Sequence, residues 1–394
     1  MKIIYFEFGQ ARLSYGSAAA MAFAGSETYI IDSSNILECN HDLIDVEIGV
    51  DGETKRIGLN VIKLPPQGKN GKHIRNSKLL DLLTSLDPSI IIAGPKNWIL
   101  AKKYARNLGI PLIFWNPVVP SILKLPSLIY YGRVYSRIIT TPFGFIYNYM
   151  FSRNSDYIMT NDLITTKIFK NMLMNNISTI WPTYARFLKQ DAYKAFLENT
   201  HRSKCSYQGD DNYILSIIAL RRDTPIYRIE LKALSLLKKV AIELPDITFV
   251  VVGASIDDLK DKDEFNRVKN IKLLGKVYDD NQIADLYRNA RGVFCPIIIP
   301  GFSNRLLEAF FYRKAIISTR IVENYYEGLI QNNNIMLGDS VTEIADTIKY
   351  TIYNDNLKIN LERKAHEYYL SYFAPIKHSN SLYKHIYKYC KMKE

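Results

Sequence analysis

The hydrophobic and polar positions of the chain follow two alternating patterns. Apolar, often β-branched runs bounded by turn residues are typical of buried strands, and apolar residues spaced three and four positions apart indicate helices. The strand pattern occurs at 1–9, 29–32, 55–64, 90–94, 110–115, 156–162 and 177–181, and again at 213–220, 247–252, 270–277, 297–299 and 315–318. Helical spacing occurs at 17–24, 77–86, 96–108, 163–173, 229–243, 281–289 and 341–352, and in a helix that opens near 304. This alternation predicts an α/β fold with parallel sheets, in which ligands bind at the carboxyl ends of the strands.

Two local signals refine this pattern in the first half of the chain. Residues 45–49 and 55–64 flank Asp51-Gly52, and Asp-Gly between β-rich runs predicts a hairpin. Gly9 and Gly16 lie in a loop between the first strand and the small-residue helix at 17–24. Glycine allows the backbone to approach a ligand closely, although the full Gly-x-Gly-x-x-Gly motif is absent.

A chain of 394 residues is long for one hydrophobic core and fits two domains of somewhat under ~200 residues each. We expect a first domain over 1–188, a polar linker over 189–211, a second domain over 212–372 and a carboxyl-terminal helix over 373–394.

Composition indicates which charged partners the chain attracts and in which compartment it occurs. The net charge of +12 predicts attraction to anions, which include nucleotide diphosphates, anionic lipid and nucleic acid. Cys39, Cys205, Cys295 and Cys390 lie far apart without a Cys-x-x-Cys motif, so neither a zinc site nor a disulfide framework is indicated. We therefore expect a reducing compartment, the cytoplasm. No stretch reaches ~18 uninterrupted apolar residues, so no membrane-spanning helix is predicted.

The segment over 120–151 differs in composition from the rest of the chain. It mixes aromatic and aliphatic residues with Lys and Arg, and no acidic residue occurs from Pro117 to Phe151. One interpretation is an interfacial surface that binds anionic membrane lipid. The other is a core helix with basic residues at its solvated edge. A nucleic-acid partner is less favoured, because no groove-binding or single-strand motif accompanies the segment.

The stretch from Ile297 to Ser318 carries the strongest candidate chemistry. A Gly/Ser/Asn turn follows an apolar strand and opens a helix near Asn304, so that backbone N–H groups converge on one point that attracts a phosphate. Glu308 lies one turn further, inside an apolar run. Two interpretations stay open: Glu308 accepts hydrogen bonds from ribose hydroxyls, or it faces solvent on an ordinary core helix.

Two further groups of residues are candidates. Arg221 and Arg222 follow the strand at 213–220, where a guanidinium fork suits a diphosphate, the alternative being a solvated basic turn. Asp279-Asp280 precedes the helix at 281–289, so an N-cap explains the pair better than a metal site does.

The order Gly-Phe-Ser-Asn-Arg-Leu-Leu-Glu-Ala at 301–309, followed by Arg-Lys-Ala-Ile-Ile-Ser at 313–318, resembles the nucleotide-sugar signature of the retaining glycosyltransferases of family 4, the glycosyl transferases group 1. That family has the GT-B fold, in which two Rossmann-like parallel-sheet domains face each other across a cleft. Its signature has two glutamates eight positions apart, the first near the donor sugar and the second on the ribose. Glu308 matches the second, and Pro300 stands at the first. Asn116 stands near the point where many members have a histidine.

The resemblance covers 213–352 well, and the first half only in its alternation of strands and helices. By resemblance, the expected nucleotide-sugar contacts are Gly9, Gly253, Val277, Gly301, Phe302, Ser303, Asn304 and Glu308, and the expected catalytic residues are Arg221, Arg222 and Asn116. The final helix is expected to pack back on the first domain. No metal or other cofactor is expected, because cations and the helix dipole can stabilise the departing diphosphate.

The resemblance implies transfer of a sugar, a hexosyl group, from a UDP- or GDP-sugar to a hydroxyl of a glycan, lipid-linked or protein-linked acceptor, with retention at the anomeric carbon. The enzyme would act in the cytoplasm or on the cytoplasmic face of a membrane. Two alternatives stay open. A GT-B protein that binds a nucleotide sugar or a partner without turnover is favoured by Pro300 and Asn116. A nucleotide-sugar epimerase would need carboxylates in the first domain, which the sequence does not identify.

Overall fold

The computed structural model describes residues 1–6, 11–32, 43–50, 53–63, 77–94, 98–115, 150, 153–171, 176–181, 213–221, 227–259, 262–277, 280–298 and 302–391. Contacts between residues divide the chain into two compact units. Unit 1 comprises Met1–Phe187 and Tyr372–Glu394, and unit 2 comprises Leu188–Ser371. No helix among the described residues is long and apolar enough to cross a membrane.

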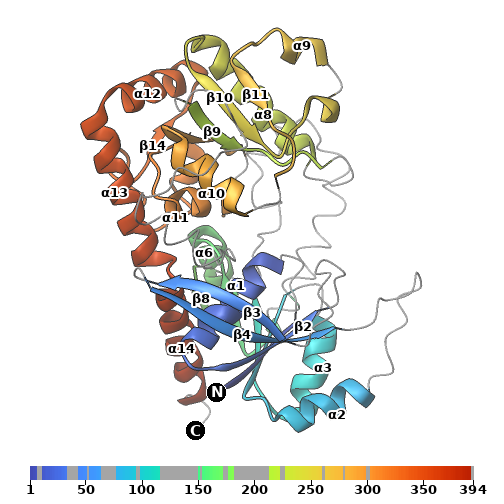
Figure 1. Ribbon diagram of the computed structural model, residues 1–394. Coiled ribbons are helices and arrows are strands. Elements are labelled where there is room, and N and C mark those ends of the chain that lie inside the picture. The colour runs from blue at the N-terminus through green and yellow to red at the C-terminus, as the bar shows by residue number, and fades with distance from the viewer. Residues whose placement is uncertain are drawn as a thin grey trace. The chain divides into compact units, whose positions relative to one another are not determined.

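Unit 1 is built on a mostly parallel sheet with helices on both faces (Figure 1). Its described strands are β1 (Lys2–Phe6), β2 (Glu27–Asp32), β3 (Leu43–Val50), β4 (Glu53–Lys63), β5 (Ile90–Ala93), β6 (Leu112–Trp115), β7 (Tyr157–Thr160) and β8 (Ile177–Thr179). Their order in the sheet is β3-β4-β2-β1-β5-β6-β7-β8. The described helices are α1 (Ala11–Phe23), α2 (Ser77–Leu86), α3 (Trp98–Leu108), α6 (Leu163–Asn171) and α14 (Pro375–Lys391).

Strand β1 shows how the sequence divides the core of unit 1 into two layers. Successive side chains of a strand point to opposite faces of its sheet. Ile3 and Tyr5 accordingly pack with residues of α1 and α14, whereas Ile4 and Phe6 pack with residues of α2 and α3. These four side chains are fully buried. The continuous apolar run therefore belongs to a central strand that helices cover on both faces.

The predicted hairpin is confirmed, and the predicted start of the first helix is wrong. Strands β3 and β4 pair antiparallel, from Leu43 opposite Asn60 to Val50 opposite Glu53. Asp51 and Gly52 themselves lie outside the described residues. Helix α1 begins at Ala11 and not at 17, so Gly16 lies inside the helix. Small side chains at Ala18, Ala19 and Ala20, all fully buried, let this helix pack closely on the sheet.

Unit 2 contains a second, wholly parallel sheet of the order β11-β10-β9-β12-β13-β14 among its described strands. These strands are β9 (Tyr213–Ile217), β10 (Thr248–Val252), β11 (Ile271–Leu273), β12 (Gly292–Cys295), β13 (Ile316–Thr319) and β14 (Met336–Gly338). The described helices are α8 (Tyr227–Glu243), α9 (Lys262–Asn266), α10 (Asp280–Asn289), α11 (Asn304–Phe311), α12 (Val341–Tyr353) and α13 (Asp355–Tyr372), with short 3-10 turns η2 (Ile256–Asp258) and η3 (Arg320–Val322).

Helices cover both faces of the second sheet. On one face, Leu234 and Leu237 of α8 and Ile348 of α12 pack with Phe249 and Val251 of β10. On the other face, α10 contacts β9, and α11 contacts β12 and β13. Each of the two units therefore has a three-layer α/β architecture with its own core.

Two details of unit 2 differ from the sequence-based expectation. The strand before the candidate turn is Gly292–Cys295 and not 297–299, because Pro296 removes a backbone donor from the sheet ladder. Helix α13 was not predicted, although its buried residues Leu361, Ala365, Tyr368 and Tyr369 have helical spacing. The helix expected near Asn304 begins at that residue.

Candidate functional site

Most of the described candidate residues lie at one edge of the sheet of unit 2. Arg221 follows β9, Gly253 follows β10, Val277 follows β11, and Ser303 follows β12 by way of a loop. These four strands are neighbours in the order β11-β10-β9-β12, and all run parallel. The carboxyl ends of parallel strands share one edge, so the sequence brings these residues to the same edge.

Gly253 is the tightest point of this edge. Its φ angle is +94°, a conformation that residues with side chains rarely adopt. A Cβ atom there would lie 2.8 Å from the carbonyl oxygen of Ile218 and 3.0 Å from Cα of Ala219. The Gly253 N–H donates to the carbonyl of Gly275 at 2.6 Å, and the Gly253 carbonyl accepts from the Leu220 N–H at 2.9 Å. Because glycine has no side chain, the backbone at this position forms hydrogen bonds with Gly275 and Leu220, which connect the ends of β9, β10 and β11.

The amino end of α11 is not capped by a side chain. Its N-cap residue, Ser303, has extended backbone angles and makes no side-chain capping hydrogen bond. The first N–H groups of any helix have no intrahelical acceptor, so those of Asn304 to Leu306 carry the partial positive charge of the helix end. The Ser303 N–H instead donates to the hydroxyl of Tyr326 at 2.6 Å. Tyr326 also packs against Phe302, with ring centroids 5.8 Å apart.

Glu308 lies one turn into α11 and is buried, with 6% of its surface exposed. The interpretation that Glu308 faces solvent is therefore wrong. The hydroxyl of Tyr287 on α10 donates a hydrogen bond to Glu308 Oε2 at 3.2 Å. The Tyr287 ring stacks on Tyr312, with centroids 4.3 Å apart and planes 14° from parallel. Two stacked rings thus fix the donor that orients the carboxylate.

Arg305 lies three positions before Glu308 on α11. Its guanidinium forms an ion pair with Glu230 of α8, and both side chains are largely buried. Burial raises the pKa of the Cys295 thiol to about 12, while Arg305 lowers it and Glu308 raises it. Both charges therefore act on the end of β12, and the thiol stays protonated at neutral pH.

The remaining sequence candidates are distributed as follows. Gly9, Asn116, Arg222 and Gly301 lie outside the described residues, as do Pro300, the linker over 189–211 and nearly all of the 120–151 segment. Arg221 is described and exposed, and Val277 is half-buried. Among the described residues, no group of three or more His, Cys, Asp or Glu side chains is placed to hold a metal ion.

Several residues of this region were missed by the sequence analysis. Tyr287 and Tyr312 have the spacing of ordinary core residues, so nothing local distinguishes them. Glu230 and Arg305 join helices that are far apart in sequence, and the pairing of the two charges depends on tertiary packing. Tyr326 follows β13 in a turn, where an aromatic residue gives no specific signal.

Comparisons with known proteins agree with this architecture. Residues 222–354 match the family model described as glycosyl transferases group 1. The structure of HepE from Anabaena in complex with UDP and glucose has a TM-score of 0.63 and 14% sequence identity, over 98% of this chain and 99% of that chain. Sucrose-phosphate synthase from Thermosynechococcus elongatus has a TM-score of 0.60 and 12% identity, over 98% and 99%. The UDP-forming α,α-trehalose-phosphate synthase from Burkholderia xenovorans has a TM-score of 0.62 and 11% identity, over 98% of each chain. No curated protein sequence matches the chain.

Proposed function

We propose that this chain, which has the GT-B fold and carries a glycosyl transferases group 1 domain over 222–354, transfers a hexosyl group from a nucleotide sugar to an acceptor hydroxyl with retention. The observation that carries the proposal is the arrangement at α11. An uncapped helix end offers backbone donors to a diphosphate, and a buried, oriented carboxylate lies one turn behind it. The ribose and the diphosphate are adjacent in a nucleotide, so the carboxylate and the helix end would bind neighbouring parts of one ligand.

Different described residues would bind the ribose, the diphosphate and the base of the donor. The Glu308 carboxylate would accept hydrogen bonds from the ribose hydroxyls, because an ionised carboxylate is an acceptor only. The amides of Asn304 to Leu306 and the guanidinium of Arg221 would stabilise the negative charge that develops on the leaving diphosphate. The close backbone at Gly253 and the turn at Val277 would contact the base. UDP is the first nucleotide to test, because HepE has been solved with UDP and with UDP-glucose.

Isothermal titration with UDP, GDP and their glucose conjugates tests the donor site. We expect saturable binding of one nucleotide. Its affinity should fall roughly tenfold or more in Glu308→Gln, because the substitution replaces one of the two carboxylate oxygens that accept from the ribose hydroxyls by an NH2 group, which is a donor. Glu367→Gln is the matched control, since Glu367 is exposed on α13 and pairs with Arg363 and Lys364 of its own helix. Absence of binding by every nucleotide would overturn the proposal.

A second candidate is binding of the nucleotide sugar without turnover. It is favoured by Pro300 at the position of the first family glutamate and by Asn116 near the family histidine. Release of free nucleotide from the donor sugar, measured with and without a panel of glycan acceptors, separates the two functions. A rate of nucleotide release that is lower in Arg221→Ala than in the unchanged protein supports the transferase. Nucleotide binding at normal affinity with no release under any condition supports the binding protein.

A further inference from the structure

Strand β11 forms an edge of the sheet of unit 2. Among the described strands it pairs only with β10. The Phe249 N–H donates to the Asn270 carbonyl, and the Leu274 N–H donates to the Val251 carbonyl. Backbone groups alternate in direction along a strand, so Lys272 also turns its N–H and carbonyl toward β10. The N–H and carbonyl of Leu273 are therefore directed to the outer edge, where another strand could pair with them.

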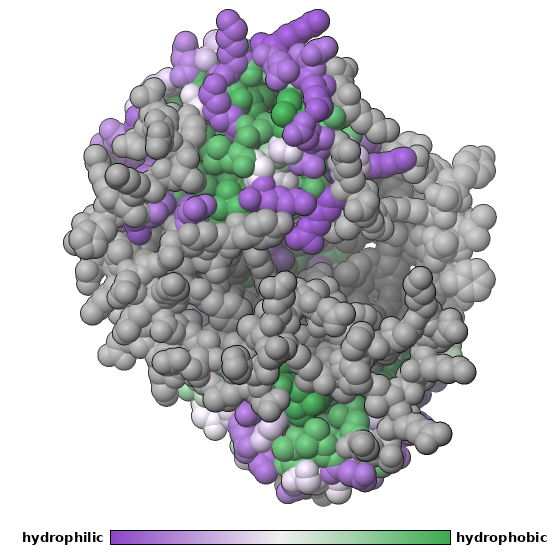
Figure 2. Space-filling model, turned by 45° about the vertical axis from the view of Figure 1, so that its right-hand side comes forward, coloured by the Kyte–Doolittle hydropathy of each residue, from purple (hydrophilic) through white to green (hydrophobic). Residues whose placement is uncertain are grey.

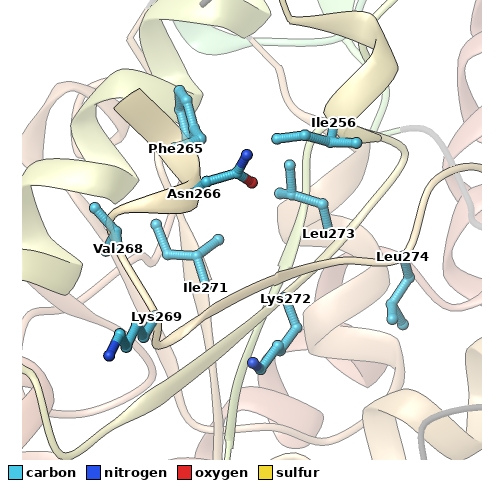
Figure 3. Close-up of a pocket in the computed structure, with 9 residues that line it drawn as sticks. All are labelled: Ile256, Phe265, Asn266, Val268, Lys269, Ile271, Lys272, Leu273 and Leu274. Carbon is cyan, nitrogen blue, oxygen red and sulfur yellow. The ribbon is translucent and has the colours of Figure 1, made fainter. Parts of the chain in front are cut away.

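An apolar crevice lies beside this edge. A cavity of about 600 Å³ is lined in part by Ile256, Phe265, Val268, Ile271 and Leu273. Figure 3 shows the side chains of Ile271 and Leu273 pointing toward Phe265 and Ile256, so that the four enclose a common space. These apolar residues are only half-buried at the margin of the core. Figure 2 shows hydrophobic surface between hydrophilic residues at the top of the view, over the end of unit 2 that carries α9 and β11 in Figure 1.

The charged residues that line the crevice are two lysines. Lys269 and Lys272 also line the cavity, and both are exposed. Within the part of the chain that the structure describes, neither ammonium group has an ion-pair partner. Figure 3 shows Lys272 on the other side of the strand from Leu273, as alternation requires. The edge thus combines the outward backbone groups of Leu273, an apolar face and two lysines that have no ion-pair partner among the described residues.

The two lysines favour an acidic strand over a second copy of this chain in the register centred on Lys272. A second copy of this chain, pairing antiparallel about Lys272, would place two lysines directly opposite each other, and like charges opposite in a sheet are destabilising. The chain as a whole carries a net charge of +12, which adds to this repulsion. An acidic strand meets neither obstacle.

We propose that β11 is a docking edge for an extended segment of a partner protein that alternates apolar and acidic side chains. The segment adds a strand to the sheet through the backbone of Leu273. Its apolar side chains enter the crevice between β11 and α9, and its acidic side chains pair with Lys269 and Lys272. This site is separate from the donor site proposed above, and it does not depend on glycosyl transfer.

The test uses fluorescence anisotropy with the full-length protein and a fluorescein-labelled peptide of about nine alternating Val and Glu residues. We expect saturable binding, which weakens roughly tenfold or more in the double variant Lys269→Glu, Lys272→Glu. The double variant Lys349→Glu, Lys384→Glu is the matched control, because both are exposed lysines outside this edge, on α12 and α14, and the change in net charge is the same. It should change the affinity less than about twofold.

Two peptides with N-methyl groups distinguish strand addition from charge attraction alone. One is methylated at the Val amides and the other at the Glu amides. A strand that pairs with β11 directs the N–H groups of every second residue toward β11 and the others away from it. Strand addition therefore requires that only one of the two methylated peptides loses binding. The proposal is overturned by absence of saturable binding, by equal binding to the Lys269→Glu, Lys272→Glu variant, or by equal effects of the two methylated peptides. Self-association that the neutral variant Lys272→Thr strengthens and the peptide prevents would assign the edge to a second copy instead.

Discussion

At the scale of single residues, Tyr287 determines how the Glu308 carboxylate is held. Its ring is fully buried and stacked on Tyr312, and its hydroxyl donates to Glu308 Oε2. We expect Tyr287→Phe to lower nucleotide affinity roughly tenfold, because it keeps the stack and removes the hydrogen bond that orients the carboxylate. Titration calorimetry measures this change.

Tyr312→Phe is the control for the Tyr287 prediction. It removes a buried hydroxyl from the other ring of the same stack. A general loss of packing would lower the thermal stability of both variants and leave their nucleotide affinities similar. An affinity that falls in both variants to the same extent would contradict the positioning role of Tyr287.

His378 links the last helix to the core of unit 1. Its Nδ1 atom lies 2.8 Å from the Trp181 carbonyl, and its Nε2 atom lies 2.7 Å from Ser17 Oγ. The hydroxyl of Tyr5 lies 3.1 Å from the same Ser17 oxygen. The ring therefore donates through Nδ1 and accepts through Nε2, which is the neutral form. Burial lowers the pKa of His378 from 6.5 to about 4.

This pKa shift predicts acid sensitivity of unit 1. The unfolded chain binds a proton near pH 6.5 and the folded chain only near pH 4, so the stabilisation is complete above pH 6.5 and is lost as the pH falls toward 4. The free energy of unfolding should fall by about 3 kcal/mol over this range. His378→Gln, which stays neutral, should lack this part of the pH dependence. The three tryptophans of the chain all lie in unit 1, so their fluorescence during urea unfolding reports on this unit alone.

At the scale of elements, Gly253 shows why the turn after β10 needs glycine. A left-handed φ angle and a close carbonyl act together there. Gly253→Ala should destabilise unit 2 by about 2–4 kcal/mol, and chemical unfolding followed by circular dichroism measures it. Gly275→Ala is the matched comparison, because Gly275 also has a positive φ angle but its Cβ would lie 3.7 Å from the nearest atom. It should cost only the conformational part, about 1–2 kcal/mol. Equal losses in the two variants would mean that the contact with Ile218 can relax.

The elements also show which parts of the fold a sequence reveals. Buried parallel strands such as β1 and β10 are continuous apolar runs, so their pattern is visible without tertiary information. Helix α13 was missed because its buried residues are separated by many polar ones. The strand before the candidate turn was placed at 297–299 because the apolar run continues through Ile299, whereas Pro296 ends β12. Periodicity records burial, whereas hydrogen bonding fixes the boundary of an element.

The candidate site likewise contains residues that the sequence pattern identifies and residues that it does not. Glu308 was identified because a carboxylate inside an apolar run breaks the helical pattern. Its partner Tyr287, and the ion pair of Arg305 with Glu230, join elements distant in sequence and were not identified. Such pairs depend on how helices pack across a sheet, which local patterns do not encode. The roles expected for Gly9, Asn116, Arg222 and Gly301 stay predictions, because these residues lie outside the described ones.

At the scale of the whole molecule, charge is the property that acts over the longest distance. The net charge of +12 should attract the chain to anionic membranes, and the 120–151 segment adds aromatic residues suited to the head-group region. We expect binding to vesicles that contain phosphatidylserine at low salt, no binding to neutral vesicles, and release as the salt concentration rises. Sedimentation with vesicles measures the bound fraction.

The source of this attraction can be located by charge reversal. Each basic residue near an anionic surface contributes about 1 kcal/mol, so replacing Lys124, Arg133 and Arg137 by Glu should weaken vesicle binding by roughly a hundredfold. The control variant replaces Lys239, Lys349 and Lys384, which are exposed lysines outside this segment, and changes the net charge by the same amount. A loss confined to the first variant assigns membrane binding to the segment. Equal losses would mean that only the overall charge matters, and an unchanged affinity in both would favour the core-helix interpretation of 120–151.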